Sequence, residues 1–353
     1  MRRKGVSQGD VARLAGVSPT AVSIVLNGKQ GLHRIAPETV ERIHQAMAEL
    51  RYRPHAVAQA LAHGRTNTIG IVLGSADISY LTHPYFGPVL QGAVRTAFDK
   101  RRFVLLYHGN ELGAKDLDAT SFADGRCDGL ILTAPFSSEG HSAPLLDLGF
   151  PFVTVGDSVQ DPRFASVDID NEDAARQLTQ YLMGLGHQHI LGLGWRDYTH
   201  SALQRLTSCR REVERAGGIY DEEILPRGDE PGTREVLCRY LGTHDQPEKN
   251  RPTALFCLTD DVAAEVTPVV RKLGFDVPQD LSIVGFDDAP IAAELSLTTV
   301  RQDPARVGEE AVRLLLRLID AGRTNGMSEE KTKVTLPTQL IERGSAAKPH
   351  QQS

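Results

Sequence analysis

Residues 6–64 read VSQGDVARLAGVSPTAVSIVLNGKQGLHRIAPETVERIHQAMAELRYRPHAVAQALAHG. The stretch contains three short amphipathic segments, followed by a proline and a tail of small residues. Helices of this length and spacing are typical of a helix-turn-helix unit that reads DNA. These residues are therefore a candidate DNA-binding head, and we expect the rest of the chain to control it.

The first segment carries signals for both ends of a helix. Ser7 can cap the start, and Asp10 three residues later completes an S-x-x-D capping pattern. Val11 and Leu14 lie on one face at helical spacing. Gly16 is a typical stop, so the first helix should end there.

The second segment starts again directly after that stop. Ser18 followed by Pro19 is a start signal, because serine accepts an unpaired amide bond and proline is tolerated at the first helical position. This helix should end at Leu26, with Val22 and Leu26 facing the first helix. The residues left facing outward, toward a DNA groove, are Pro19, Thr20, Ser23 and Ile24.

The third segment begins near Pro37, after a break at Asn27-Gly28. Ala36 lacks the usual capping side chain. The expected apolar stripe of the third helix is Val40, Ile43, Met47 and Leu50. Three such helices could also form a small bundle with no nucleic-acid role.

The distribution of charge favours the DNA-binding interpretation. Residues 1–65 carry ten Lys or Arg and four Asp or Glu, a net charge of +6, whereas the whole chain carries −6. A basic head on an acidic body is the pattern expected when the head alone binds phosphates.

The motif in the head also resembles a known family. Residues 10–28 fit D-V-A-x-x-A-G-V-S-x-x-x-V-S-x-V-L-N-G, and residues 46–54 fit A-M-A-E-L-x-Y-x-P. Both resemble the lactose-repressor/galactose-repressor (LacI) family of bacterial transcription regulators, and the similarity continues through the whole chain. The loop at residues 29–35 is longer than in the family's shortest members. It adds His33 and Arg34, which could contact phosphates or form a solvated loop.

The resemblance implies that Pro19, Thr20 and Ile24 meet base edges. Two of these side chains cannot form hydrogen bonds, and a bidentate arginine–guanine pair is unavailable to them. We therefore expect modest direct readout, with a larger share from phosphate contacts and DNA shape. The expected DNA-binding residues are Ser7, Ser18, Pro19, Thr20, Ser23, Ile24, Asn27, Arg34, Ala58 and Leu61.

Residues 55–62 form an apolar, alanine-rich segment only about two helical turns long. A helix this short is marginal alone in water, because nucleation is costly. The resemblance implies a hinge helix that pairs with its dimer mate in the minor groove, where Leu61 wedges into the central base step. The alternative is a flexible connector whose leucine packs on the body.

The 353 residues, 41% of them hydrophobic, can bury a core spread over two or three domains. No apolar run reaches the length of a membrane span, and no secretory signal follows the basic N-terminus, so we expect a cytoplasmic protein. The widely spaced cysteines form no C-x-x-C motif and are expected to be buried free thiols. They are Cys127, Cys209, Cys238 and Cys257.

From Thr68 onward, short apolar runs alternate with longer helical patterns. Continuous apolar runs indicate strands buried on both faces, so the sheets should be mainly parallel and doubly wound. The expected strands are residues 69–73, 103–107, 129–133, 152–155, 190–194, 254–258 and 281–286, with helices at 86–101, 172–185 and 262–273 among them.

The resemblance adds that this α/β body has two lobes, hinged like a periplasmic sugar-binding protein. The chain should cross between them near Ala165, Leu297 and Met327. The expected division is a head at 1–53, a hinge and linker at 54–67, a body at 68–342 and a polar tail at 343–353. Within the body, the N-lobe is expected at 68–165 and 298–326, and the C-lobe at 166–297 and 327–342.

Polar residues stand at the ends of the expected strands, where ligands of parallel sheets bind. A carboxylate at such a place can also be only a helix cap. The resemblance matches several of these positions to the family's effector pocket, in which aromatic faces, carboxylates and a guanidinium suit a polyhydroxyl ligand. These residues are Tyr85, Phe86, Asp157, Arg205 and Asp287.

Two departures from the family pattern blur the identity of the ligand. Thr259, followed by Asp260, stands where asparagine is common, and Glu230 stands where an aromatic residue is frequent. We include all three among the expected effector-binding residues. The added carboxylate of Glu230 would fit a cationic or amino ligand, or point into solvent, and a sugar remains the first expectation.

Motifs for an enzyme or a cofactor site are missing from the sequence. Residues 192–194 lack the third glycine of a dinucleotide loop, and no P-loop, G-x-S-x-G or H-E-x-x-H is present. His187 and His189 flank a structural turn, and the calcium-like start at residues 168–171 lacks its glycine and closing glutamate. We therefore expect no cofactor and no metal.

The sequence thus predicts a ligand-responsive transcription regulator, most simply a repressor, that binds double-stranded operator DNA as a homodimer. Each head would read one half-site of a pseudo-palindrome. An effector would act only through its differential binding to two lobe arrangements. The alternatives are a sugar-binding transport protein and a sugar-modifying enzyme. Residues 345–353 carry no leucine heptads, so we expect no terminal coiled coil.

Overall fold

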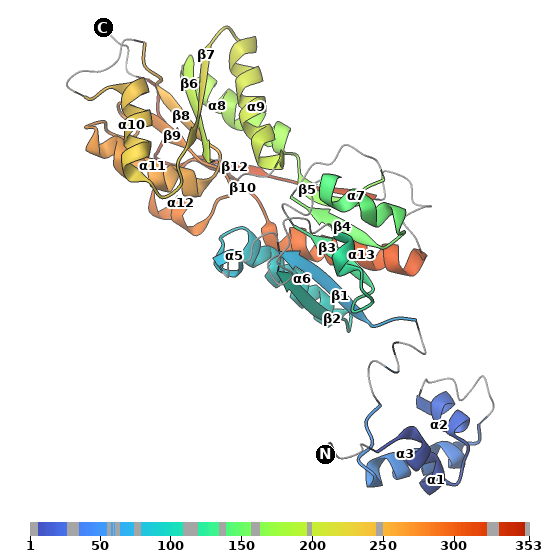
Figure 1. Ribbon diagram of the computed structural model, residues 1–353. Coiled ribbons are helices and arrows are strands. Elements are labelled where there is room, and N and C mark those ends of the chain that lie inside the picture. Colours follow the sequence, from blue (N-terminus) through green and yellow to red (C-terminus); the bar gives the residue numbers. More distant parts are fainter. Residues whose placement is uncertain are drawn as a thin grey trace. The chain divides into compact units, whose positions relative to one another are not determined.

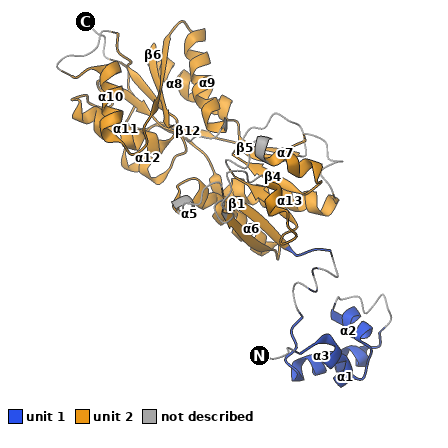
Figure 2. Cartoon of the chain, in the orientation of Figure 1, with its two compact units in different colours: residues 1–67 blue, residues 68–353 orange. Residues whose placement is uncertain are grey.

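The computed structural model (Figure 1) describes residues 6–26, 35–54, 58, 60, 64–73, 79–108, 119–133, 139–156, 163–195, 200–244, 250–322 and 332–349. The chain divides into two compact units, residues 1–67 and residues 68–353 (Figure 2). The predicted fold class is confirmed: the first unit is helical, and the second is an α/β body with parallel sheets.

The head contains the three predicted helices, α1 (Gln8–Ala15), α2 (Pro19–Leu26) and α3 (Pro37–Glu49). One small apolar cluster joins them, and it is completed by partly buried residues that include Leu26, Val40, Met47 and Leu50. The buried members are Val11, Ala12, Ala15, Val22, Val25, Ile43 and Ala46.

The ends of α1 follow the predicted signals. Ser7 accepts from the backbone of Asp10, and the carboxylate of Asp10 accepts from the backbone of Ser7, which completes a capping box. Gly16 ends the helix with φ at 66°, a left-handed conformation that favours glycine. The expected core position of Leu14 is wrong. Its side chain is exposed, and Ala12 takes the place in the cluster.

The chain bends by 107° between α1 and α2, within the range of a helix-turn-helix. Together, α1 and α2 have the length and hydropathy of a membrane-spanning helix, but the bend between them means that they do not form one continuous helix. In the described part of the chain, no single helix is long and apolar enough to cross a membrane.

The first lobe of the body is built on a six-stranded sheet in the order β11-β5-β4-β3-β1-β2. Every neighbouring pair is parallel. Its strands are β1 (Thr68–Leu73), β2 (Phe103–His108), β3 (Gly129–Leu132), β4 (Phe152–Val155), β5 (Ser166–Ile169) and β11 (Lys333–Leu336). Its helices are α5 (Ser79–Thr82), α6 (Phe86–Asp99), α7 (Glu139–Asp147) and α13 (Pro304–Ala321), with a 3₁₀ turn at Ala119–Phe122.

Helices α6 and α13 pack closely side by side in the first lobe (Figure 1). Two glycines allow this approach. A Cβ atom on Gly92 would overlap the backbone of Ala305, and one on Gly308 would overlap the backbone of Val89. Any larger residue at either position would force the two helices apart.

The second lobe is built on a four-stranded parallel sheet in the order β7-β6-β8-β9. Its strands are β6 (His189–Trp195), β7 (Ile219–Leu225), β8 (Ala254–Cys257) and β9 (Ser282–Val284). Its helices are α8 (Asn171–Leu185), α9 (His200–Arg215), α10 (Glu230–Leu241), α11 (Asp260–Lys272) and α12 (Pro290–Glu294).

The crossings between the lobes differ from the predicted positions. The boundary near Ala165 is wrong, because β5 still pairs with β4 of the first lobe. The boundary near Leu297 is also too early, because β-bridges at Thr298 and Arg301 keep those residues on the second lobe. Met327 lies outside the described residues, and β11 returns residues up to Leu336 to the first lobe.

After β11 the chain crosses for the last time. β12 (Gln339–Ile341) pairs antiparallel with β10 (Thr299–Arg301), so two of the crossing segments run side by side. The polar segment expected as a tail at 343–353 packs onto the second lobe within residues 343–349. Ser345 is buried, and its carbonyl accepts from the backbone N–H of Ile283 at 2.8 Å, which extends the edge of β9.

The four cysteines are free, as predicted. Cys127, Cys209 and Cys257 are buried, whereas Cys238 is half-buried. Burial raises the pKa of the Cys127 thiol, which keeps that side chain in its unreactive protonated form.

Candidate functional site

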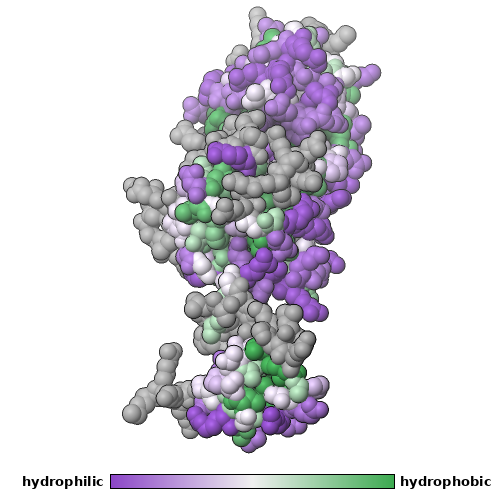
Figure 3. All heavy atoms as spheres, turned by 90° about the vertical axis from the view of Figure 1, so that its right-hand side faces the viewer, coloured by the Kyte–Doolittle hydropathy of each residue, from purple (hydrophilic) through white to green (hydrophobic). Residues whose placement is uncertain are grey.

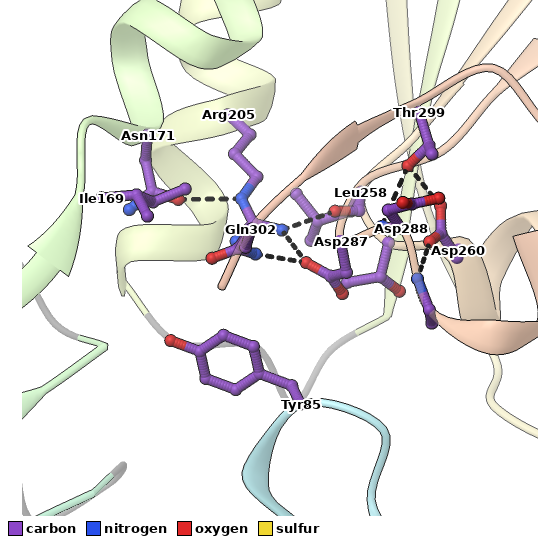
Figure 4. A network of polar contacts seen from close by, with 12 residues as sticks. Tyr85, Ile169, Asn171, Arg205, Leu258, Asp260, Asp287, Asp288, Thr299 and Gln302 are labelled. Carbon is purple, nitrogen blue, oxygen red and sulfur yellow. Dashed lines mark hydrogen bonds and ion pairs between the residues drawn. The ribbon is translucent and has the colours of Figure 1, made fainter. Parts of the chain in front are cut away.

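Polar side chains gather at the carboxyl ends of β8 and β9 around Arg205, which points in from α9 (Figure 4). Arg205 is buried, and its guanidinium lies 3.8 Å from the centroid of the Phe286 ring. Its Nη1 donates to the carbonyl of Leu258 at 3.0 Å and to Oδ1 of Asp287 at 3.3 Å. Two of the expected effector-binding residues, Arg205 and Asp287, therefore form an ion pair in the structure.

Two further residues complete this cluster, and sequence reasoning missed both. Asn171, the first residue of α8, accepts from Nε of Arg205 at 2.9 Å. Gln302, directly after β10, donates from Nε2 to Oδ1 of Asp287. Both residues stand beside crossings between the lobes, so the Arg205–Asp287 pair is bonded to two of the segments that connect the lobes.

The backbone at Asp287 has φ at 117°, and Asp288 has φ at 55°. Both values lie in the left-handed region, which is costly for residues other than glycine and is concentrated at functional sites. Burial raises the pKa of Asp287 to about 6, although Arg205 and Gln302 oppose that rise. Asp288 points elsewhere and forms ion pairs with Arg301 and Arg343, both at 2.6 Å.

Asp260 was expected to bind effector, and the structure assigns it a different role. Its side chain has an exposed fraction of 0%. One oxygen accepts from the backbone N–H of Ala289 at 2.7 Å, and the other accepts from the hydroxyl of Thr299 at 2.7 Å. Burial raises the pKa of Asp260 to about 8, with nearby Asp287 adding to the rise. This carboxyl group fastens α11 to the crossing strand β10.

The two departures from the family pattern do not enlarge the cluster. Thr259 caps α11 by accepting from the backbone of Val262 at 3.4 Å. Glu230 lies apart from the cluster, and its exposed carboxylate pairs with Lys272 at 2.6 Å on the last turn of α11. Asp260 lies on the first turn of that helix, about 18 Å away along its axis.

Tyr85 and Phe86 come from the first lobe, at the start of α6. Their rings meet edge to face, with centroids 5.1 Å apart. Figure 4 shows Tyr85 on the other side of the cluster from Arg205, below Gln302 and Asp287. His83 Nε2 also lies 3.9 Å from Oδ2 of Asp261 on α11, so the two lobes meet beside these aromatic rings. Asp157 lies outside the described residues.

The head offers α2 as its candidate contact surface. Pro19 and Thr20 are exposed, and Ser23 and Ile24 are half-buried. Ser18 accepts from the backbone of Ala21 at 3.1 Å and therefore starts α2, just as Ser7 starts α1. Ala58 is exposed. Three other expected DNA-binding residues lie outside the described part of the chain: Asn27, Arg34 and Leu61.

The two histidines near the turn before β6 are bonded within the protein. His187 contacts the Thr253 hydroxyl at 2.9 Å and the Ala347 carbonyl at 3.0 Å. His189 contacts the Asn250 carbonyl and Asp221, both at 2.7 Å. Across the described ranges, no group of three His, Cys, Asp or Glu side chains is placed to hold a metal ion.

A cavity of about 230 Å³ lies elsewhere in the second lobe. Its lining includes Thr267 of α11, Glu294 of α12 and Ser345 of the C-terminal segment. None of the expected effector residues that the structure describes lines it.

Two sequence families match this chain. Residues 9–55 match bacterial regulatory proteins of the lacI family, and residues 179–346 match a periplasmic binding protein-like domain. The first match covers the helix-turn-helix, and the second covers most of the second lobe together with α13 and β11 of the first lobe.

Similar curated proteins match along nearly their full length. The transcriptional regulator CelR of Thermobifida fusca is 30% identical over 98% of this chain and 99% of its own. The transcriptional repressor PurR of Erwinia tasmaniensis is 31% identical over 96% of each chain. The regulator GalR of Escherichia coli is 29% identical over 96% of this chain and 95% of its own.

Solved structures give the same result. The lac repressor dimer bound to operator and the anti-inducer ONPF has a TM-score of 0.77 at 25% identity, covering 98% of this chain and 100% of that one. A CelR–cellobiose complex has a TM-score of 0.65 at 25% identity, covering 96% and 99%. The full-length matches to regulators, the helix-turn-helix and the two-lobed body together show that this chain belongs to the LacI family of bacterial transcription regulators.

Proposed function

We propose that this regulator is a homodimeric repressor whose affinity for a pseudo-palindromic operator is controlled by a small polyhydroxyl ligand. One observation carries the proposal: α2 is capped and anchored by buried Val22 and Val25, and it leaves Pro19 and Thr20 exposed on a head with a net charge of +6. A fixed, exposed helix on a basic unit is what groove binding requires.

The exposed end of α2 supports limited readout of bases. Thr20 can bond to either kind of base, and Pro19 and Ile24 can contact a thymine methyl group. The Ser7 and Ser18 hydroxyls are engaged in helix caps and remain at the surface, where they can also reach phosphates. Phosphate contacts would then supply most of the affinity, and DNA shape much of the specificity.

An apolar surface on the first lobe supports the homodimer. Val94 and Phe98 stand one turn apart on α6, and Phe103 begins the edge strand β2. The side chains of Phe98 and Phe103 are 79% and 72% exposed. In the face drawn in Figure 3, hydrophobic residues also gather over the first lobe, whereas the second lobe is mostly hydrophilic. Exposed aromatic residues of this kind are typical of a buried interface.

The Arg205–Asp287 pair supports a sugar or sugar derivative as effector. A guanidinium and a carboxylate held side by side can each bond to a hydroxyl group, and the aromatic rings of Tyr85 and Phe86 offer apolar faces nearby. The related CelR is solved with cellobiose. Cellobiose is therefore the first probe, and its effect on operator binding distinguishes an inducer from a co-repressor.

The hinge completes the proposal for DNA binding. Residues 55–62 would fold as paired helices in the minor groove when two heads bind one operator, with Leu61 as the wedge. Lobe movement would change the distance between the two hinges, so the effector would act through its differential affinity for the two lobe arrangements.

The decisive experiment is selection of bound DNA from a random duplex pool by the full-length protein at near-physiological salt. Specific binding persists there, whereas non-specific phosphate binding fades. A recovered palindrome supports the proposal. A variant with Thr20→Ala and Ile24→Ala keeps every charge, so it should still bind DNA at low salt, but it should enrich the palindrome less strongly than the original protein does. Equal enrichment by both proteins would contradict base reading by α2.

A further inference from the structure

We infer that Asp168 orients the effector-binding arginine, Arg205, through Asn171, and that this relay links the two lobes. The inference rests on the proposed role of Arg205 in effector binding. Asp168 belongs to β5 of the first lobe's sheet, where it pairs in register with Thr335 of β11. Asn171 and Arg205 belong to helices of the second lobe. A relay through these three residues therefore spans the first crossing.

The carboxylate of Asp168 is fully engaged as an acceptor. Oδ2 accepts from the Ser201 hydroxyl at 2.9 Å and from Nδ2 of Asn171 at 3.2 Å. Oδ1 accepts from the backbone N–H of Ile169 at 2.7 Å. Ser201 and Arg205 are four residues apart on α9 and so lie on the same face of that helix. Asp168 therefore contacts α9 directly as well as through Asn171.

The position of Asp168 determines which way the Asn171 amide is turned. A carboxylate can only accept, so the amide must present Nδ2 to Asp168, which leaves Oδ1 for Arg205. Oδ1 then accepts from Nε of Arg205 at 2.9 Å (Figure 4). If the amide were turned the other way, two donors would face each other at Arg205. Asp168 thus fixes the orientation of the Asn171 side-chain amide, which could otherwise turn either way.

The bond between Nε of Arg205 and Oδ1 of Asn171 determines which guanidinium nitrogen is left to bind a ligand. Nε is held by Asn171, and Nη1 is held by Leu258 and Asp287. In the described part of the chain no hydrogen-bond acceptor for Nη2 is found, so Nη2 remains as the guanidinium nitrogen available to a ligand. Rotation of the guanidinium about its stem would place a different nitrogen there. Arg205 is therefore presented correctly only while β5 and α9 hold this arrangement.

The relay explains how the effector site can sense the arrangement of the lobes. Asp168 moves with the first lobe, whereas Arg205 and Asp287 move with the second. A change at the first crossing would break the Asp168 bonds and release the Asn171 amide. Effector affinity would then differ between the two lobe arrangements, which is the requirement for allosteric control. Asp168 is a positioning residue in this scheme and does not itself contact the ligand.

The test is hydrogen exchange at Nε–H of Arg205 in the full-length protein labelled with ¹⁵N at arginine Nε. The signal is assigned by its loss in Arg205→Lys. Asp168→Asn keeps the size of the side chain and removes a carboxylate whose pKa is raised by burial, so the variant should fold. Its amide can turn a donor toward Nδ2 of Asn171, so we expect exchange at Arg205 to be about tenfold faster.

A second variant separates positioning from a general loss of structure. In the double variant Asp168→Asn with Asn171→Asp, the amide donates to the new carboxylate, which again accepts from Nε of Arg205. Exchange should return to within about twofold of the original protein. The control is Asp170→Asn, the same change at the exposed cap of α8, where asparagine caps as well as aspartate. It should leave exchange at Arg205 unchanged.

Slow exchange in Asp168→Asn, or no recovery in the double variant, would overturn the relay. Cellobiose is then titrated into the same proteins, with binding expected to weaken in Asp168→Asn and to recover in the double variant. If cellobiose binds Asp168→Asn as tightly as the original protein, the relay has no role in effector binding and the inference fails. If cellobiose binds none of them, that result counts against cellobiose as effector, while the exchange data alone decide the relay.

Discussion

Asp260 accepts a hydrogen bond from the Thr299 hydroxyl at 2.7 Å, and this bond joins the first turn of α11 to the crossing strand β10. Its second oxygen holds the backbone of Ala289, just before α12. Neither oxygen faces a ligand, because the side chain has an exposed fraction of 0%. The carboxyl group therefore stabilises the frame that carries Asp287.

The raised pKa of Asp260 predicts an unusual pH dependence of stability. The folded-state pKa of about 8 exceeds the ordinary aspartate pKa of 3.8, so between these values the folded state binds more protons than the unfolded state. The contribution of this group therefore weakens as pH rises from about 4 to about 8. Asp260→Asn mimics the protonated acid and removes this dependence.

We expect Asp260→Asn to gain thermal stability relative to the original protein as the pH is raised from 5 to 8. Circular dichroism melts of both proteins over that range measure the difference. The control is Asp229→Asn, the same change at the exposed cap of α10, which should melt in parallel with the original protein. A constant difference between Asp260→Asn and the original protein would show that Asp260 is ionised throughout.

The raised pKa of Asp287 predicts that effector binding strengthens as the pH rises, whereas the stability contribution of Asp260 weakens. The pKa of Asp287 is raised to about 6, and hydroxyl donors on a ligand bond more strongly to the ionised form. Cellobiose affinity should therefore fall as the pH drops through 6. Asp287→Asn should weaken binding about 10- to 100-fold at pH 7.5, as expected for loss of a hydrogen bond to a charged group.

Calorimetric titration of both proteins between pH 5.5 and 7.5 checks this prediction. The affinity of Asp287→Asn should be flat across that range, because the titrating group is gone. Asp276→Asn, a change at an exposed aspartate in the loop after α11, is the control and should follow the original protein. If the pH dependence persists in Asp287→Asn, another group is responsible.

The parts of the fold predicted from sequence share one property: the burial of each element is visible as a pattern of apolar residues within that element. The runs that form β1, β3 and β4 are continuously apolar because both faces are covered. β7 was missed because it is an edge strand with the sequence IYDEEIL, and most of it is partly exposed. The crossings were misplaced because pairing of β5 and β11 is set by distant partners.

The candidate site divides in a similar way. Arg205 and Asp287 could be expected because they follow strands and match a family pattern, and the structure brings them together. Asn171 and Gln302 could not be expected, because a single amide side chain near a helix start or a strand end gives no indication of which residue it will bond. The contacts of Asp260 and Glu230 could not be predicted for a different reason: a carboxylate at a helix start fits a ligand, a cap or a salt bridge equally well.

The exposed aromatic residues of the first lobe predict where the dimer can be broken. Phe98→Lys places a charge on the proposed interface and should shift the protein from dimer to monomer, because burying an unpaired charge is costly. Sedimentation velocity measures the change. Leu148→Lys adds the same charge at another exposed apolar residue of this lobe and should leave a dimer. A dimeric Phe98→Lys would place the interface elsewhere.

The hinge predicts a separation between specific and non-specific binding. If Leu61 wedges into the central base step, Leu61→Ala should weaken operator binding roughly 10- to 100-fold, since the kinked complex loses its inserted side chain. Binding to random DNA depends on phosphate contacts and should change little. Titrations of the selected operator and of random duplex, each over a range of salt concentrations, measure both quantities. Leu14→Ala makes the same substitution at an exposed leucine of the head and should alter neither. Equal loss on both DNAs in Leu61→Ala would instead support a connector whose leucine packs on the body.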